Sequence, residues 1–313
     1  MAASPQAHTF TRVQLLGYLS LCLIWGSTWL AIRVVVHDVP PFEAAALRFV
    51  AAGALLLGAA LLQKRPWPRG RSQWTAVFVL SLTMMALPYG LLFWAEQHVM
   101  SSMTAILYSA MPLTVSLFTP VMMHRKVPRT AVYGMVIAFA ALLNLFYTGE
   151  LGATRRSIVG GVLVLLSMAL SSWSVVYAKL RLRDVDSVVA TGLQFLFGSV
   201  VLLWATWALE AHRHAIWTRP ALLAMGFLTI FGSAAAFVIY YWLLKKMQPY
   251  QLSTISLITP LIALAEGWLY GEPVRLMMVI AIVLVLGSVR SVLRAEAETD
   301  AEDNILMLRD DAQ

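Results

Sequence analysis

Two ionisable residues, Arg48 and Glu266, lie inside apolar runs of about 20 residues, long enough to cross a membrane as helices. A charge at the centre of such a helix costs about 2.5–3.5 kcal/mol, so it normally faces protein or water and has a partner. At about 1.5 Å per residue, we expect both residues to lie about 6–9 Å below the same membrane surface, where they could meet. One interpretation is a charge pair that opens when a carboxylate binds Arg48 or a proton binds Glu266. The other is a permanent structural ion pair, or an arginine bound to helix-end carbonyls.

Glu266 also belongs to a polar helix face. At about 100° per residue, Ser256, Thr259, Glu266 and Tyr270 fall within about 120° of one another. In a membrane, such a face must contact a cavity or another helix. Helix packing alone would explain Ser256 and Thr259, but it explains a glutamate less readily. The face is therefore a candidate for ligand binding.

Aromatic residues inside the apolar runs are the next candidates. Trp25 and Trp173 fall well within their runs, where they could stack on a ligand ring or simply fill the core. Weaker candidates of the same kind are Tyr89, Tyr108 and Tyr240.

Three charged residues fall near the outer ends of the predicted helices: Arg33, Glu43 and Glu96. They could form an outer gate, or they could be charges solvated at the membrane interface.

The elements that carry these residues follow from composition. Of the 313 residues, 60% are hydrophobic and 12% are charged, where a soluble protein carries about 25% charge. We predict an all-α membrane protein of ten transmembrane helices in contact with the lipid bilayer. Their expected spans are 15–35, 42–62, 74–96, 102–123, 130–147, 157–179, 187–209, 220–244, 251–270 and 275–293.

The formal charge of +7 does not indicate a nucleic-acid partner, because the basic residues lie in short loops between apolar runs. Most lysines and arginines fall on one side, which predicts that both termini are cytoplasmic in a plasma or inner membrane. The histidines lack metal-ligand spacing, and we see no nucleotide-binding loop, so no metal, cofactor or catalytic residue is expected. The only cysteine, Cys22, excludes an intrachain disulfide, and the oligomeric state carries no signal.

The two halves of the chain correspond under a shift of 148 residues. The shift places Trp25 on Trp173 and Pro112 on Pro260, with breaks between apolar runs kept in step. Five spans per copy would bring the second copy in from the opposite side, which gives an inverted repeat that opens a midplane site alternately to either side. Chance alignment of apolar helices is the alternative. Because they are expected to bend their helices, Pro112 and Pro260 are candidate gating residues, together with Glu43 and Glu96.

This organisation predicts a cytoplasmic tail over residues 1–14, a first repeat over 15–147 and an external linker over 148–156. A second repeat follows over 157–293. The acidic segment 294–313 is expected to be a disordered cytoplasmic tail.

The chain resembles the EamA-type ten-helix members of the drug/metabolite transporter superfamily. The resemblance rests on Trp25-Gly26-Ser27, on Arg48, on the run from Ala105 to Pro112, and on Thr259-Pro260-Leu261 with Gly271-Glu272. It implies a pseudosymmetric carrier that moves small organic metabolites, often outward, and it adds Ser27 to the candidate binding residues. One departure is His124, which stands where the first repeat of the family usually has a glutamate.

A secondary transporter is therefore the expected function, and the chain is not expected to be an enzyme. A buried arginine suits a carboxylate, and aromatic walls suit a flat or apolar group, so amino acids or related carboxylates are the expected substrates. Export and proton coupling follow from the resemblance. The alternatives are a channel or receptor, and a membrane-embedded enzyme, for which no aspartate lies within a predicted span.

Overall fold

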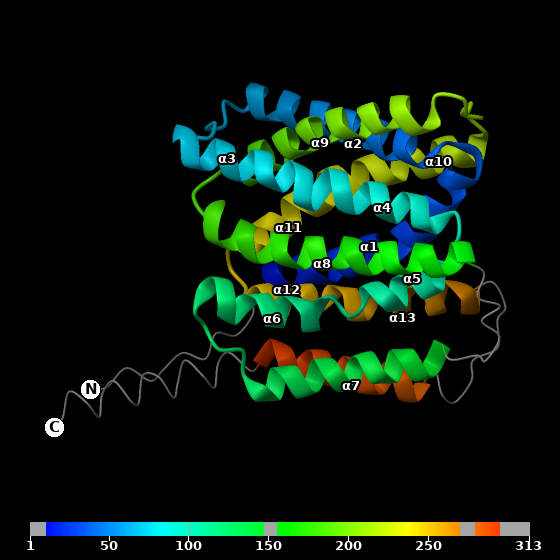
Figure 1. The fold of residues 1–313 in the computed structure, drawn as a ribbon. Coiled ribbons are helices and arrows are strands. Elements are labelled where there is room, and N and C mark those ends of the chain that lie inside the picture. Colours follow the sequence, from blue (N-terminus) through cyan, green and yellow to red (C-terminus); the bar gives the residue numbers. More distant parts are fainter. Residues whose placement is uncertain (1–10, 100, 147–154, 270–278, 295–313) are drawn as a thin grey trace.

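Every element in the described part of the chain is a helix. The computed structural model describes residues 11–99, 101–146, 155–269 and 279–294, and its helices lie side by side in stacked layers (Figure 1). The helices are α1 (Arg12–Asp38), α2 (Pro41–Leu62), α3 (Gly70–Leu80), η1 (Ser81–Ala86), α4 (Leu87–Glu96), α5 (Ser101–Tyr108), α6 (Met111–Met123), α7 (Arg129–Phe146), α8 (Arg155–Arg181), α9 (Ser187–Glu210), α10 (Arg219–Phe227), η2 (Leu228–Ala235), α11 (Ala236–Leu244), α12 (Pro249–Ser253) and α13 (Ile255–Leu269). A last helical stretch covers residues 279–294.

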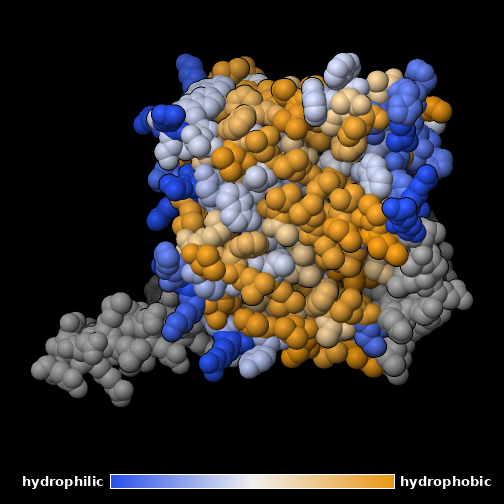
Figure 2. Space-filling view, viewed as in Figure 1, coloured by the Kyte–Doolittle hydropathy of each residue, from blue (hydrophilic) through white to orange (hydrophobic). Residues whose placement is uncertain are grey.

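Seven helical segments in the described part are long and apolar enough to cross a membrane. Figure 2 shows an apolar band across the molecule with hydrophilic residues along its two sides, as a bilayer requires. The protein is therefore a multi-span membrane protein, as predicted. The seven segments are Arg12–Asp38, Pro41–Leu62, Gly70–Glu96, Met103–Met123, Arg155–Arg181, Ser187–Glu210 and Arg219–Leu244; a shorter apolar helix covers Arg129–Asn144.

Prolines and hydroxyl caps set where several helices begin. Pro41 stands at the start of α2, where its missing N–H is not needed. Thr11 accepts from the backbone N–H of Gln14 in a capping box at the start of α1. Thr218 accepts from Ala221 N–H at the start of α10.

Four helical segments are irregular. Two contain π turns, η1 and η2, and the first is followed by Pro88 at the start of α4. Between α5 and α6 the break falls just before Pro112, as expected. Between α12 and α13 it falls at Thr254, whereas Pro260 lies inside α13, so the two corresponding prolines take different places relative to the break.

The two halves pack against each other along their length. Helix α2 lies along α9, η1 contacts α8 and α9, and η2 contacts α1 and α2. Small residues allow the close approach, because an added Cβ at Gly53 would lie 2.8 Å from Leu196 and one at Gly192 would lie 2.7 Å from Leu57. The core between these helices holds the central cavity.

Candidate functional site

A central cavity lies between helices of both halves. The space open to the centre of a water-sized sphere is about 90 Å³. One water needs about 10–15 Å³ by this measure, so the cavity has room for a small organic molecule. Seven of the sequence-predicted site residues line it: Trp25, Arg48, Tyr89, Tyr108, Tyr240, Ser256 and Thr259.

Arg48 is the cationic group of the described lining. It is 1% exposed and lies on α2, two turns from the helix start. Its Nε donates to Ser233 Oγ at 2.5 Å and its Nη2 donates to the carbonyl of Gly232 at 3.0 Å. Its guanidinium carbon lies 5.1 Å from the ring centre of Tyr89 and 5.9 Å from that of Phe93, within the range of cation–π attraction. These contacts fix the guanidinium at the cavity wall.

The carbonyl that binds Arg48 comes from a π turn. A π turn replaces the usual i−4 hydrogen-bond register with i−5, so carbonyls at its ends become available to groups outside the helix. Trp25 Nε1 also donates to Gly232 O, at 3.4 Å. Within η2, Ser233 Oγ donates to Leu228 O at 2.9 Å, which orients its lone pairs for Arg48. The irregular backbone thus builds an acceptor site for a cation.

Aromatic rings form a continuous wall beside Arg48. The ring centre of Trp25 lies 5.5 Å from that of Phe237 and 5.2 Å from that of Tyr240. Trp29 meets Tyr108 edge to face at 5.7 Å. This wall gives the cavity an apolar surface that can accept a compact hydrocarbon or a flat group.

Hydroxyl groups also line the cavity, where α12 meets α13. Ser253, Ser256 and Thr259 each donate to a backbone carbonyl three residues earlier. Their oxygens keep lone pairs that can accept a hydrogen bond from a ligand. The predicted polar face of this helix therefore lies at the cavity over its described part.

Two predicted site residues, Trp173 and Ser27, are not among the residues that line the cavity. Trp173 stacks on Tyr177 with ring centres 4.8 Å apart, although it corresponds to Trp25. Ser27 donates to Leu23 O within α1. Glu266 belongs to α13 but its side chain lies outside the described residues, as does Tyr270, so the meeting of Arg48 and Glu266 stays a prediction.

Near the predicted outer ends of the helices, charged side chains form hydrogen bonds with backbone groups. The backbone N–H groups of Phe42 and Glu43 donate to Glu210 Oε2 at 3.1 and 3.2 Å. Arg33 Nη1 donates to Val99 O at 3.0 Å. Glu96 is 0% exposed, so its interpretation as a solvated charge is wrong.

Sequence reasoning missed several residues of these sites. Trp29 follows Trp25 by one helical turn, a spacing that could have placed it on the same face. Glu210 could have been sought as an acceptor for the first N–H groups of α2. Gly232 and Ser233 carry no signal, because the π turn that presents them has none in the sequence.

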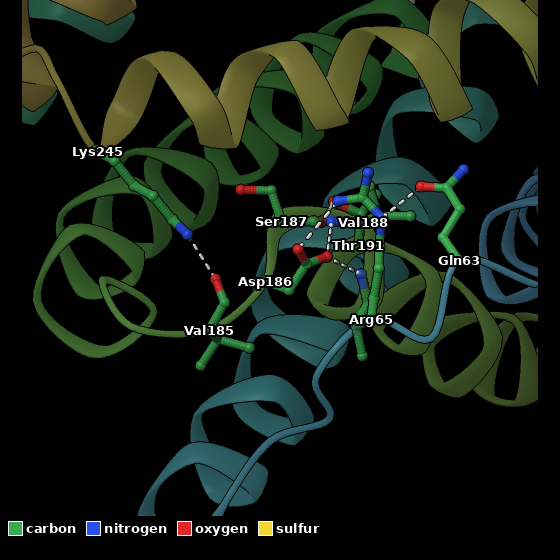
Figure 3. Close-up of polar contacts among 9 residues, drawn as sticks. Gln63, Arg65, Val185, Asp186, Ser187, Val188, Thr191 and Lys245 are labelled. Atoms are coloured by element: carbon green, nitrogen blue, oxygen red, sulfur yellow. Dashed lines mark hydrogen bonds and ion pairs between the residues drawn. The ribbon is translucent and has the colours of Figure 1, made fainter. Parts of the chain in front are cut away.

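A second hollow, of about 380 Å³, lies near the starts of α9 and α12. Its lining includes four cations: Arg125, Lys179, Arg183 and Lys245. Burial lowers the pKa of Lys245, against the raising effect of Asp186 and Asp184. The lysine donates to Val185 O (Figure 3). The side of the protein predicted to be cytoplasmic is thus basic around this hollow.

Asp186 anchors the start of α9 beside this hollow (Figure 3). Its Oδ1 accepts from the N–H groups of Val188 and Val189, as an N-cap does. Its Oδ2 pairs with Arg65 Nη1 at 3.0 Å. The loop after α2 is thereby bound to the first turn of α9.

The chain matches one protein family and resembles several individual proteins. The sequence model of the EamA-like transporter family matches residues 13–147 and 158–294. The chain is 29% identical to the uncharacterized transporter YoaV of Bacillus subtilis, over 82% of this chain and 87% of that one. It is 27% identical to protein PagO of Salmonella typhimurium, over 86% and 90% of the two chains. It is 28% identical to the uncharacterized inner membrane transporter YedA of Escherichia coli K12, over 79% of each.

The fold also matches a solved structure. The chain aligns with the crystal structure of another protein with a TM-score of 0.72 at 19% identity. The alignment covers 90% of this chain and 96% of the other. At this identity, the match concerns the fold alone.

Proposed function

Because the chain belongs to the EamA-like transporter family, we propose that it is a secondary transporter of small organic metabolites that carry a carboxylate. The family match confirms the resemblance first indicated by Trp25-Gly26-Ser27 and Arg48. The proposed mechanism is alternating access, in which a central site opens to one side of the membrane and then to the other.

The observation that carries this proposal is the buried guanidinium of Arg48 in a cavity lined by both halves of the chain. Its described contacts are a hydroxyl, a carbonyl and aromatic rings, and none of these neutralises its charge. A charge in a low-dielectric site is costly without a counter-charge, so a ligand carboxylate would be bound strongly.

The inverted arrangement of the halves is supported by the direction of corresponding helices. Under the shift of 148, the span from α3 to α4 corresponds to the span from α10 to α11. In Figure 1 these two spans run in opposite directions across the molecule. Rocking of one half against the other would then expose the cavity alternately.

We extend the proposal to export from a cell with both termini in the cytoplasm, and to proton coupling at Glu266. The excess of lysine and arginine on one side supports this orientation. A carboxyl group inside a span is a suitable proton carrier. The Glu266→Gln variant is expected to fold and to change the pH dependence of transport, and an unchanged pH profile would count against coupling there.

The test uses proteoliposomes that contain the purified protein and are loaded with a mixed extract of amino acids and organic acids. Efflux is followed by mass spectrometry, with and without the same extract outside. A carrier gives saturable efflux that is stimulated from the opposite side. Non-saturable efflux without such stimulation would indicate a channel and overturn the proposal.

The role of Arg48 is tested in the same vesicles. We expect Arg48→Met to lower efflux of carboxylates at least tenfold, because one tenfold loss equals about 1.4 kcal/mol and a charged hydrogen bond contributes more. The matched control is Leu196→Met, at the corresponding position of the second half. Wild-type efflux by a correctly inserted Arg48→Met variant would remove Arg48 from the binding site.

A further inference from the structure

Three buried side chains of the central cavity end in a polar atom that has no hydrogen-bond partner among the described residues. They are the Nη1 of Arg48, the Nε1 of Trp29 and the hydroxyl of Tyr240. A buried polar group without a partner destabilises the protein, because it has lost its hydrogen bond to water. A ligand that supplies the missing partners would therefore remove that cost.

The types of these atoms define the ligand. Guanidinium N–H and indole N–H groups only donate, while a tyrosine hydroxyl can donate or accept. The ligand must therefore present hydrogen-bond acceptors to at least two of the three groups. A carboxylate satisfies Arg48, and a second acceptor is needed for Trp29.

The unpaired donors of Trp29 and Arg48 belong to α1 and α2. Both of these helices are bound to one carbonyl group. Trp25 Nε1 and Arg48 Nη2 both donate to Gly232 O, which holds α1 and α2 against η2. Trp29 lies one turn after Trp25 on α1 and also lines the cavity. One small molecule can thus contact the α1 face and the guanidinium together.

The positive charge of Arg48 favours some classes of ligand over others. Arginine stays protonated in proteins, so the described lining carries one uncompensated positive charge. A monoanion neutralises it, whereas the ammonium of an amino acid would add a second positive charge to the same low-dielectric space. The oxygens of Ser253 and Ser256 could accept from an ammonium, but they do not neutralise it.

The volume of the cavity limits the size of the ligand. At about 10–15 Å³ for each water-sized group, the open space of 90 Å³ holds about six to nine non-hydrogen atoms. Apart from the hydroxyl groups already described, the walls are mostly apolar, with Ile32, Leu92 and Phe237 among them. The part of the ligand away from the carboxylate is therefore a compact hydrocarbon.

We propose that the cavity binds a small monocarboxylate with a second acceptor beside the carboxylate and a compact apolar body, in the manner of a 2-oxo or 2-hydroxy acid, in preference to a zwitterionic amino acid. This inference rests on the proposed transport function and specifies its substrate class.

The test compares four compounds that share one branched hydrocarbon body. They are 4-methyl-2-oxopentanoate, 4-methylpentanoate, leucine and isopentylamine. Binding is measured on the purified full-length protein in detergent from the ligand-dependent rise in melting temperature, which gives an apparent Kd without transport. We expect the oxo acid to bind most tightly and leucine to bind at least tenfold more weakly than 4-methylpentanoate.

Variants assign each contact. Arg48→Met should remove the binding of both acids. Trp29→Phe keeps a ring against Tyr108 but lacks the N–H, so it should cancel the advantage of the oxo acid over 4-methylpentanoate. Tyr177→Phe, at an aromatic residue outside the cavity lining, is the matched control and should bind as the wild type does.

Several results would overturn the proposal. They are leucine binding as tightly as the acids, isopentylamine binding most tightly, or neither acid stabilising the protein at millimolar concentration. Leucine binding that is lost in Glu266→Gln would place an ammonium site at Glu266 instead. None of these outcomes affects the vesicle experiment, in which absence of stimulation from the opposite side would remove the transport function itself.

Discussion

Two corresponding spans, Gly70–Glu96 and Arg219–Leu244, show how one irregularity serves two purposes. Each is interrupted by a π turn at the same place under the shift of 148, and each π turn packs against the first two helices of the other half. The turn η1 is bound to α8 through Ser174, which donates to Thr83 Oγ1 at 2.8 Å. The turn η2 instead gives Ser233 and Gly232 to Arg48. The first turn joins helices, while the second builds the binding site.

The ends of the same spans differ in a similar way. Gln97, just after α4, donates through its amide to Val36 O at 3.2 Å. Lys245, just after α11 and corresponding to Gln97, donates to Val185 O. Both side chains bind a neighbouring helix end, but only the second can change its charge. At the π turns the second half supplies the acceptors for a cation of the first half, whereas at these span ends it supplies the cation itself.

The largest effect is expected from removing the hydroxyls that hold the two π turns. Ser233→Ala leaves the buried Nε of Arg48 without its partner, at a cost of about 2–3 kcal/mol, whereas Ser174→Ala loses a neutral hydrogen bond worth about 1 kcal/mol. Thermal unfolding in detergent measures both, and carboxylate binding should weaken only in Ser233→Ala. Equal losses of affinity in the two variants would end the distinction between the turns.

An intermediate effect is expected from glycines at the two turns. A Cβ at Gly198 would lie 2.9 Å from the carbonyl oxygen of Ser81 in η1, while a Cβ at Gly232 in η2 would lie 2.9 Å from the methyl group of Thr28. Backbone cannot yield as a side chain can, so Gly198→Ala should destabilise by about 1–2 kcal/mol and Gly232→Ala by less. The comparison of melting temperatures checks this order, and the reverse order would show that η2 is the more rigid turn.

The smallest effect concerns Lys245. Its pKa is lowered by burial, so between that pKa and the ordinary value of about 10.5 the unfolded chain binds more protons than the folded one. Stability from this group should therefore rise with pH through that alkaline interval and be flat near neutrality. Lys245→Gln, which copies Gln97, should remove the rise in melting temperature. Parallel curves for the two proteins would contradict the shift.

The sequence predicts those features for which a membrane leaves few options. A charge such as Arg48 and the aromatic residues Tyr89 and Tyr240 can be placed in a cavity because lipid excludes the charge and the polar ring ends. Trp25 and Trp173 show the limit, since they are equivalent in sequence and only Trp25 faces the cavity. Which face of a helix meets the site depends on packing between the halves, and the pattern of each half alone does not contain it.

The acceptors of Arg48 could not be predicted for a different reason. A π turn adds one residue to a helical turn and rotates every following side chain by about 100° relative to a regular helix. Gly232 and Ser233 lie within this turn and bind Arg48 in its altered register. Pro88 gives a local reason for the irregular turn in the first half, but Ala236 stands at the corresponding position of the second.

The charge of Arg48, which none of its described contacts neutralises, also has an electrical consequence. Transfer of one elementary charge across a full potential of 100 mV changes the free energy by about 2.3 kcal/mol. Among the described residues of the lining, Arg48 alone is charged, so the unloaded cavity is positive and a bound monoanion makes it neutral. If the field falls across the central region during rocking, the membrane potential acts on the return of the unloaded protein and leaves the loaded step nearly unaffected. Voltage would then set how often the transporter resets rather than how it moves its cargo.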